Sequence, residues 1–88
     1  MRELKTIGRF AYQYSDEGNL CIADIKDLST LSGLNNILNV LKKYKNNFKQ
    51  YCKLKYEDHI FIGMEFENIP ETEVVEILED EALKNPVE

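Results

Sequence analysis

Glycine and proline are scarce in this sequence, which has four glycines and two prolines in 88 residues and no stretch of low complexity. This composition excludes a collagen-like or disordered chain, and the 43% share of hydrophobic residues is typical of a globular domain. No run approaches the roughly 20 apolar residues of a membrane-spanning helix, and residues 1–5 lack the apolar core of a signal peptide. We therefore expect a single domain over residues 1–88 that is cytoplasmic and has no membrane partner.

Cysteine and histidine, which supply many nucleophiles and metal ligands, are also rare. Cys21, Cys52 and His59 are too few and too widely spaced for a zinc site of roughly four ligands. The sequence contains no glycine-rich phosphate loop and no pattern of nucleophile, base and orienting residue. An 88-residue domain also has little room for an enclosed pocket. We predict that the protein is not an enzyme, with no catalytic residue, metal or cofactor.

We expect the two cysteines, the histidine and one aspartate to have structural rather than catalytic roles. Cys21 and Cys52 are expected to be reduced and buried as small hydrophobic residues, with a disulfide or redox pair as the alternative. His59 is expected in an exposed hairpin loop. Asp24 shares a strand face with apolar residues, so we expect it to be half exposed or paired with Arg9 or a neighbouring lysine.

What the sequence does have is a charge divided between its two ends. Residues 1–56 carry ten Lys/Arg and five Asp/Glu, whereas residues 57–88 carry one Lys and eleven Asp/Glu. The two parts therefore have formal charges of +5 and −10, which gives the net charge of −5. Such an asymmetry determines which partners a small protein attracts and repels.

The hydrophobic pattern predicts two strands, a helix, two more strands and a final helix. Alternation predicts a strand over residues 4–14, and a turn at 16–19 followed by a short apolar run predicts a return strand over 20–25. Apolar residues on both faces of the second strand predict a central position in the sheet. Steps of three and four predict a helix over 30–47 and another from 70 to 85, with Pro70 in its first turn and Asn85-Pro86 at its end.

The third and fourth strands, over residues 49–56 and 60–67, form a predicted hairpin. A three-residue loop would place Tyr56 opposite Ile60 and bring Ile60 and Ile62 into the core. We therefore expect a β-β-α-β-β-α domain of the α+β class, a two-layer sandwich. Its four-stranded, mostly antiparallel sheet would carry both helices on one face.

Two surfaces are candidates for binding a partner. The acidic surface consists of Glu65, Glu67, Glu73, Glu76, Glu79 and Asp80, and such charge steers association with a basic partner. The aromatic and basic surface consists of Tyr51, Lys53, Lys55 and Phe61 on the outer face of the hairpin, where an exposed aromatic pair would be suited to an interface.

From these observations we predict a protein-interaction module, a small acidic regulator or inhibitor of the immunity or phage counter-defence type that docks on a macromolecule. A nucleic-acid-associated module is the alternative, because the lysines between Lys42 and Lys55 are interleaved with aromatic residues. A small subunit of a larger assembly, including a homo-oligomer, is a further alternative.

Overall fold

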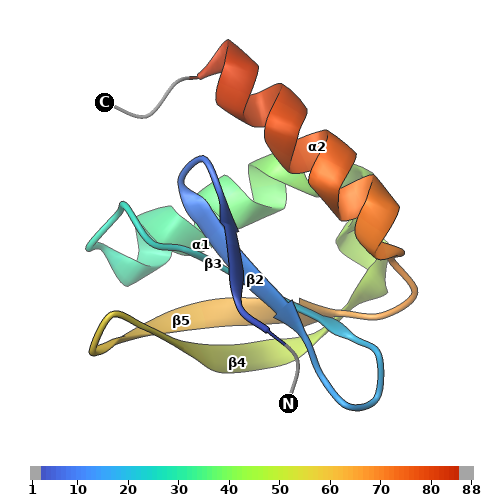
Figure 1. Cartoon of the computed structure of the whole chain (residues 1–88), viewed down its shortest axis with the longest axis horizontal. Helices are drawn as coiled ribbons and strands as arrows, with labels where there is room; N and C mark the ends of the chain where they lie inside the picture. The colour runs from blue at the N-terminus through green and yellow to red at the C-terminus, as the bar shows by residue number, and fades with distance from the viewer. Residues whose placement is uncertain (1–2, 86–88) are drawn as a thin grey trace.

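The computed structural model describes residues 3–85, which form an antiparallel sheet and several helical segments (Figure 1). In chain order, the elements are β1 (Lys5–Ile7), β2 (Phe10–Tyr14), β3 (Leu20–Asp24), α1 (Thr30–Val40), the 3₁₀ helix η1 (Lys42–Asn47), β4 (Phe48–Tyr56), β5 (His59–Phe66) and α2 (Glu71–Lys84). The strands lie in the order β1-β2-β3-β5-β4. The α+β class and the antiparallel sheet are confirmed, but the sheet has five strands and not four.

The additional strand arises at Gly8, which divides the segment predicted as one strand over residues 4–14. Gly8 has a φ of 60°, in the left-handed region that glycine adopts without strain. Ile7 pairs with Phe10, so the chain reverses over Gly8 and Arg9 and forms a β1–β2 hairpin. The turn also packs closely on α2, because a Cβ at Gly8 would lie 3.2 Å from that of Ala82.

The first predicted helix is shorter than residues 30–47, whereas the second has nearly its expected bounds. The α-helix α1 ends at Val40, and η1 continues the chain as a tighter helix that leads into β4. Helix α2 begins at Glu71 directly after Pro70, and its first turn holds Glu71 and Glu73 as expected. It ends at Lys84, and Pro86 lies outside the described residues.

Side chains from both helices and from three strands pack into one main hydrophobic cluster. Its fully buried members are Phe10, Tyr12, Tyr14, Leu20, Ile22, Ile37, Leu41, Met64, Phe66, Ile69, Val74 and Leu78. A second cluster of Ala11, Cys21, Ala23 and Leu54 lies on the other face of the sheet. Apolar residues therefore cover both sides of β3, which is entirely buried between β2 and β5, as its sequence pattern predicted.

The register of the β4–β5 hairpin differs from the sequence prediction. Tyr56 pairs with His59 and Lys55 with Ile60, so the loop has two residues and not three. Glu57 and Asp58 fill this loop with φ values of 47° and 66°, the conformation that suits the twist of a tight hairpin. This register turns Lys53 and Lys55, and not Leu54, to the face that carries Ile60 and Ile62, and Ile60 is 66% exposed rather than in the core, because it lies beyond the part of β5 that pairs with β3.

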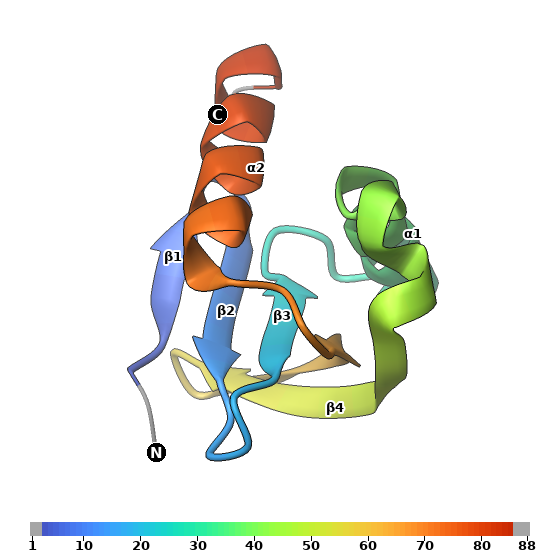
Figure 2. The same ribbon diagram turned by 90° about the vertical axis from the view of Figure 1, so that its right-hand side faces the viewer.

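Gly63 marks the point at which the hairpin leaves the rest of the sheet. The pairing of β3 with β5 extends from Leu20 and Phe66 to Ile22 and Met64, and Gly63 is the first residue of β5 beyond it. A Cβ at Gly63 would overlap the carbonyl oxygen of Ile22, so only glycine allows this close approach of the two backbones. Figure 2 shows β4 crossing beneath β2 and β3 at a steep angle. Leu54 of β4 thereby reaches the second cluster.

Candidate interaction surface

A groove lies between the start of α1 and the β4–β5 hairpin. Its cavity of about 150 Å³ is lined by the loop before α1, the first turns of α1 and the beginning of β5. The lining residues are Asp24, Asp27, Leu28, Ser29, Thr30, Gly33, His59, Ile60, Phe61 and Ile62. In Figure 1, α1 lies above the hairpin, and the loop that leads into α1 lies on the same side as the hairpin turn.

Large exposed hydrophobic side chains concentrate on the elements that form this groove. Among the described residues there are seven such side chains, and six of them belong to α1 with its entry loop or to the β4–β5 hairpin. We call these six the apolar surface: Leu28, Leu31, Leu38, Tyr51, Ile60 and Ile62. The seventh, Leu83, lies on α2. Because single exposed hydrophobic residues are normal, it is this concentration that indicates a binding surface.

The orientation of α1 places its exposed leucines toward the hairpin. Ile37 is buried in the main cluster, and Asn36 on one flank of the helix donates a hydrogen bond to Asp24. The exposed Leu31 and Leu38 lie seven residues apart on the flank opposite Asn36, and the half-buried Leu34 lies between them, so the three form one stripe. Since α1 packs over β3 and β5, this stripe faces the side on which β5 and β4 lie.

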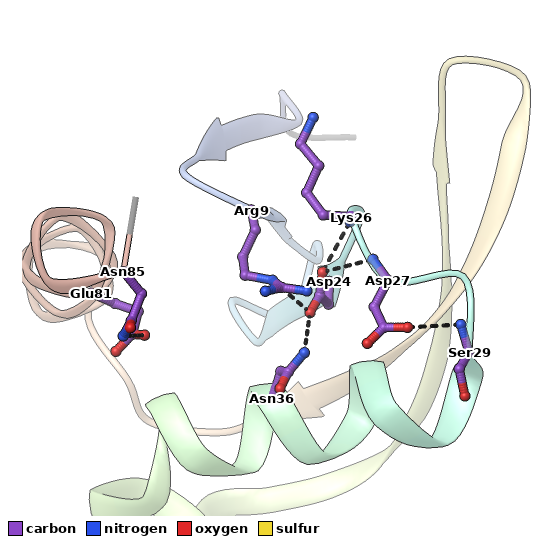
Figure 3. Close-up of polar contacts among 8 residues, drawn as sticks. All are labelled: Arg9, Asp24, Lys26, Asp27, Ser29, Asn36, Glu81 and Asn85. Atoms are coloured by element: carbon purple, nitrogen blue, oxygen red, sulfur yellow. Dashed lines mark hydrogen bonds and ion pairs between the residues drawn. The ribbon is translucent and has the colours of Figure 1, made fainter. Parts of the chain in front are cut away.

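A buried aspartate fixes the loop that leads into α1 (Figure 3). The Asp24 side chain is fully buried, and its Oδ2 accepts hydrogen bonds from Arg9 Nε at 2.9 Å and Asn36 Nδ2 at 2.7 Å. Its Oδ1 accepts from the backbone N–H groups of Lys26 at 2.9 Å and Asp27 at 3.3 Å. The predicted pairing with Arg9 is confirmed, and both oxygens are used within the fold.

Two lysines of the predicted aromatic and basic surface lie across the hairpin from Ile60 and Ile62, which line the groove. Lys53 pairs across the hairpin with Ile62 and Lys55 with Ile60, so all four side chains share one face with Tyr51. Neither lysine forms an ion pair with any residue in the described range 3–85. The edge of the apolar surface therefore carries two uncompensated positive charges.

Phe61 does not belong to that surface, although the sequence predicted it there. The two-residue loop places Phe61 opposite Leu54, on the face that packs against the second cluster. Its ring stacks on that of His59 at 6.3 Å between centroids. His59 is exposed as expected, but it is the first residue of β5 and not part of the loop.

The six acidic residues do not form one surface. Glu65 is only 6% exposed and accepts hydrogen bonds from Gln50 and Asn19, which lower the pKa of its carboxyl. Placing Glu65 on the surface was therefore wrong, because it faces the same side of β5 as Gly63 and Phe61.

The other acidic residues divide into paired and exposed groups. Glu67 pairs with Lys49 at 3.8 Å. Glu73 accepts a hydrogen bond from the Tyr44 hydroxyl, which lowers the pKa of the carboxyl, and it also pairs with Lys43. The remaining three, Glu76, Glu79 and Asp80, lie on the exposed side of α2, where Asp80 pairs with Lys84 at 3.0 Å.

Hydrogen bonds to two tyrosines hold the beginning of α2 against the sheet. Tyr12 donates to Glu71 at 2.9 Å, and burial followed by this hydrogen bond raises the pKa of Tyr12 to about 12. Tyr14 donates to the backbone oxygen of Ile69, and burial raises its pKa to about 12 as well. These contacts are structural and lie away from the groove.

The two cysteines are free, and both lie at the second cluster. A hydrogen bond between the thiols, together with burial, raises the pKa of Cys52. Cys52 lies opposite Gly63, which has no side chain to separate it from Cys21 on β3. Across residues 3–85, no group of three His, Cys, Asp or Glu side chains could hold a metal ion.

Within the same described range, no helix combines the length and hydrophobicity that crossing a membrane requires. Comparison of the chain with protein-family models, curated proteins and solved structures found no match.

Proposed function

We propose that this chain is a non-enzymatic protein-interaction module that docks on a partner protein through the apolar surface. The observation that carries this proposal is the concentration of six of the seven large exposed hydrophobic side chains on α1, its entry loop and the hairpin. An apolar centre with an aromatic residue and basic residues at its edge is the usual composition of a protein interface.

Covering the exposed side chains of the apolar surface would favour association. Leu31 is 70% exposed and Ile60 is 66% exposed, so a partner that covered them would remove most of each side chain from water. Full burial of one such side chain contributes about 1.5–3 kcal/mol. Covering three or four members of the apolar surface therefore yields several kcal/mol, against which the entropy lost on association must be set.

The biological role that fits such a module is that of a small regulator or inhibitor, as in immunity or phage counter-defence. A cytoplasmic domain of this kind would act by occupying a surface of its partner. The exposed carboxylates of Glu76, Glu79 and Asp80 on α2 would influence how quickly the two proteins meet, whereas the apolar surface would hold the complex.

Nucleic-acid binding is the second candidate, favoured by the unpaired lysines Lys53 and Lys55 beside the exposed ring of Tyr51. Against it stand Ile60 and Ile62, which lie directly across the hairpin from these lysines and offer nothing to a phosphate backbone.

The test uses two substitutions of the same kind at exposed positions. Wild-type protein, the I60K variant and the L83K variant are immobilised, and proteins retained from an extract of the cells that make the chain are quantified by mass spectrometry. We expect one protein retained equally by wild type and L83K and at least tenfold less by I60K. Equal retention by all three refutes the proposal, and retention lost on nuclease treatment favours nucleic acid.

A further inference from the structure

We infer that the occupant of the groove is an amphipathic helix of a partner protein, apolar on one face and carrying carboxylates along one flank. This inference rests on the proposed function and names the partner chemistry that the same surface selects.

The exposed leucines of α1 have the spacing of a helix-packing seam. Leu31 and Leu38 occupy equivalent positions one heptad apart, as core residues of a coiled coil do, and the half-buried Leu34 between them packs against the main cluster. Leu31 and Leu38 are seven residues apart, about 10.5 Å along the helix axis. A second helix of about three turns, laid beside α1, would contact this seam on one side and Ile60 and Ile62 on the other.

The edge of the sheet is unsuitable for an additional strand, although β4 is the outermost strand on that side. Its register is interrupted by an irregularity between Phe48 and Gln50, and it carries three lysines at positions 49, 53 and 55. Bulges and lysines are the features by which edge strands avoid further pairing. The hairpin therefore offers the side chains on its face to a partner, and not its backbone.

The spacing of the two unpaired lysines matches the pitch of a helix. Lys53 and Lys55 are two residues apart on β4, and such residues are separated by about 6.7 Å along a strand. Residues four apart on a helix are separated by about 6 Å. Acidic side chains at positions i and i+4 of a helix running along β4 would therefore each face one lysine.

A second copy of this chain does not supply such a helix. The apolar residues Val74 and Leu78 of α2 are buried in the main cluster of their own molecule. The exposed side of α2 presents Glu76, Glu79 and Asp80 with only Leu83 as a large hydrophobic residue. Helix α1 of a second copy has exposed leucines but no acidic residue that could face Lys53 and Lys55, so the occupant is a different protein.

The experiment uses two synthetic 21-residue helical peptides labelled with a fluorophore. Both carry leucine at core positions of a heptad; one has glutamate at positions i and i+4 along its flank, and the other has lysine there. Fluorescence anisotropy should show that the acidic peptide binds wild-type protein at least tenfold more tightly than the basic peptide. The K53E/K55E variant should reverse this preference, I60K should bind neither peptide, and L83K should behave as wild type.

Four outcomes overturn the inference: equal binding of both peptides, no binding of the acidic peptide, an unchanged preference in K53E/K55E, or tighter binding of a single-stranded 20-nucleotide DNA. A doubled mass in light scattering that I60K abolishes would instead assign the surface to a second copy. If the peptides fail while I60K still loses the protein retained by wild type and L83K, the helical occupant is wrong and the proposed function stands.

Discussion

Replacing Asp24 with asparagine is expected to destabilise the fold through the loop that leads into α1. The carboxylate is fully buried and accepts hydrogen bonds from Arg9, Asn36 and two backbone N–H groups. An amide of the same shape retains one acceptor oxygen and directs an NH₂ group at donors that need an acceptor. The substitution therefore removes hydrogen bonds and also leaves donor groups facing one another.

The magnitude follows from the number and kind of hydrogen bonds lost. Hydrogen bonds to a charged group contribute about 1.5–3 kcal/mol each. The Arg9 side chain is 35% exposed and can turn partly to water, so we expect a loss of about 3 kcal/mol from D24N, near the lower limit for two such bonds. A domain of this length has a free energy of unfolding of about 4–13 kcal/mol, so this loss is a large fraction of it.

Asp27 provides the matched control, since it is an aspartate in the same loop. Its carboxylate accepts a hydrogen bond from the Ser29 N–H at 2.9 Å, and the residue is only half-buried. Because this hydrogen bond is exposed to water, which weakens the contribution of a charged acceptor, and an asparagine side chain keeps an acceptor oxygen for the Ser29 N–H, D27N should cost at most about 1 kcal/mol. Urea unfolding followed by circular dichroism measures both values. If D24N costs no more than D27N, the interpretation of Asp24 as the residue that fixes the start of α1 is wrong.

Three further predictions concern the hairpin and the tyrosines. G63A should lower the free energy of unfolding by about 1–3 kcal/mol or more, because its Cβ overlaps the backbone of β3; no loss in urea unfolding would refute the close approach. I60S should change the free energy of unfolding by less than about 0.5 kcal/mol, whereas L54A should cost about 2–5 kcal/mol; comparable losses for the two variants would favour the three-residue loop, in which both side chains lie in the core. Because the folded-state pKa values of Tyr12 and Tyr14 are raised from 10.0 to about 12, the folded protein holds protons that the unfolded chain has lost. Stability should therefore fall as pH rises from 10 to 12, and thermal unfolding of Y12F should show a smaller decrease over this interval than wild type.

The elements could be predicted from sequence where one periodicity applied along a whole segment. The short apolar run in residues 20–25 and the three-and-four spacing after Pro70 each predict one kind of element, and both elements are present. The break at Gly8 was missed because glycine at that position continues the alternation, and only the φ of 60° shows that the chain turns there.

The prediction of the hairpin register was wrong because it placed every alternating apolar residue of β5 in the core. Ile60, Ile62, Met64 and Phe66 alternate regularly, but the first two are exposed and the last two are buried. The strand leaves the sheet at Gly63, so one face of β5 begins outside the core and ends inside it. A pattern of hydrophobicity cannot distinguish a residue that is covered by its own chain from one that a partner covers.

The sequence predicted the β4 part of the candidate surface but not the α1 part. Tyr51, Lys53 and Lys55 share one exposed face as expected, because alternation along β4 fixes their side. The three-and-four spacing predicts the apolar side of α1 but not its exposure, and Leu31 is 70% exposed. Helix α1 has more apolar residues than its own molecule buries, and this surplus is the feature of the sequence that could have indicated an exposed apolar surface.

The two walls of the groove are attached to the protein in different ways. Helix α1 is held by Ile37 in the main cluster and by Asn36 on Asp24, which leaves it little freedom to move. The hairpin pairs with the remaining strands at only three positions, between β3 and β5. Beyond these positions it contacts the sheet through the packing of Leu54 in the second cluster. A small rotation about that short seam would therefore change the width of the groove while α1 stays in place and the interior keeps its packing.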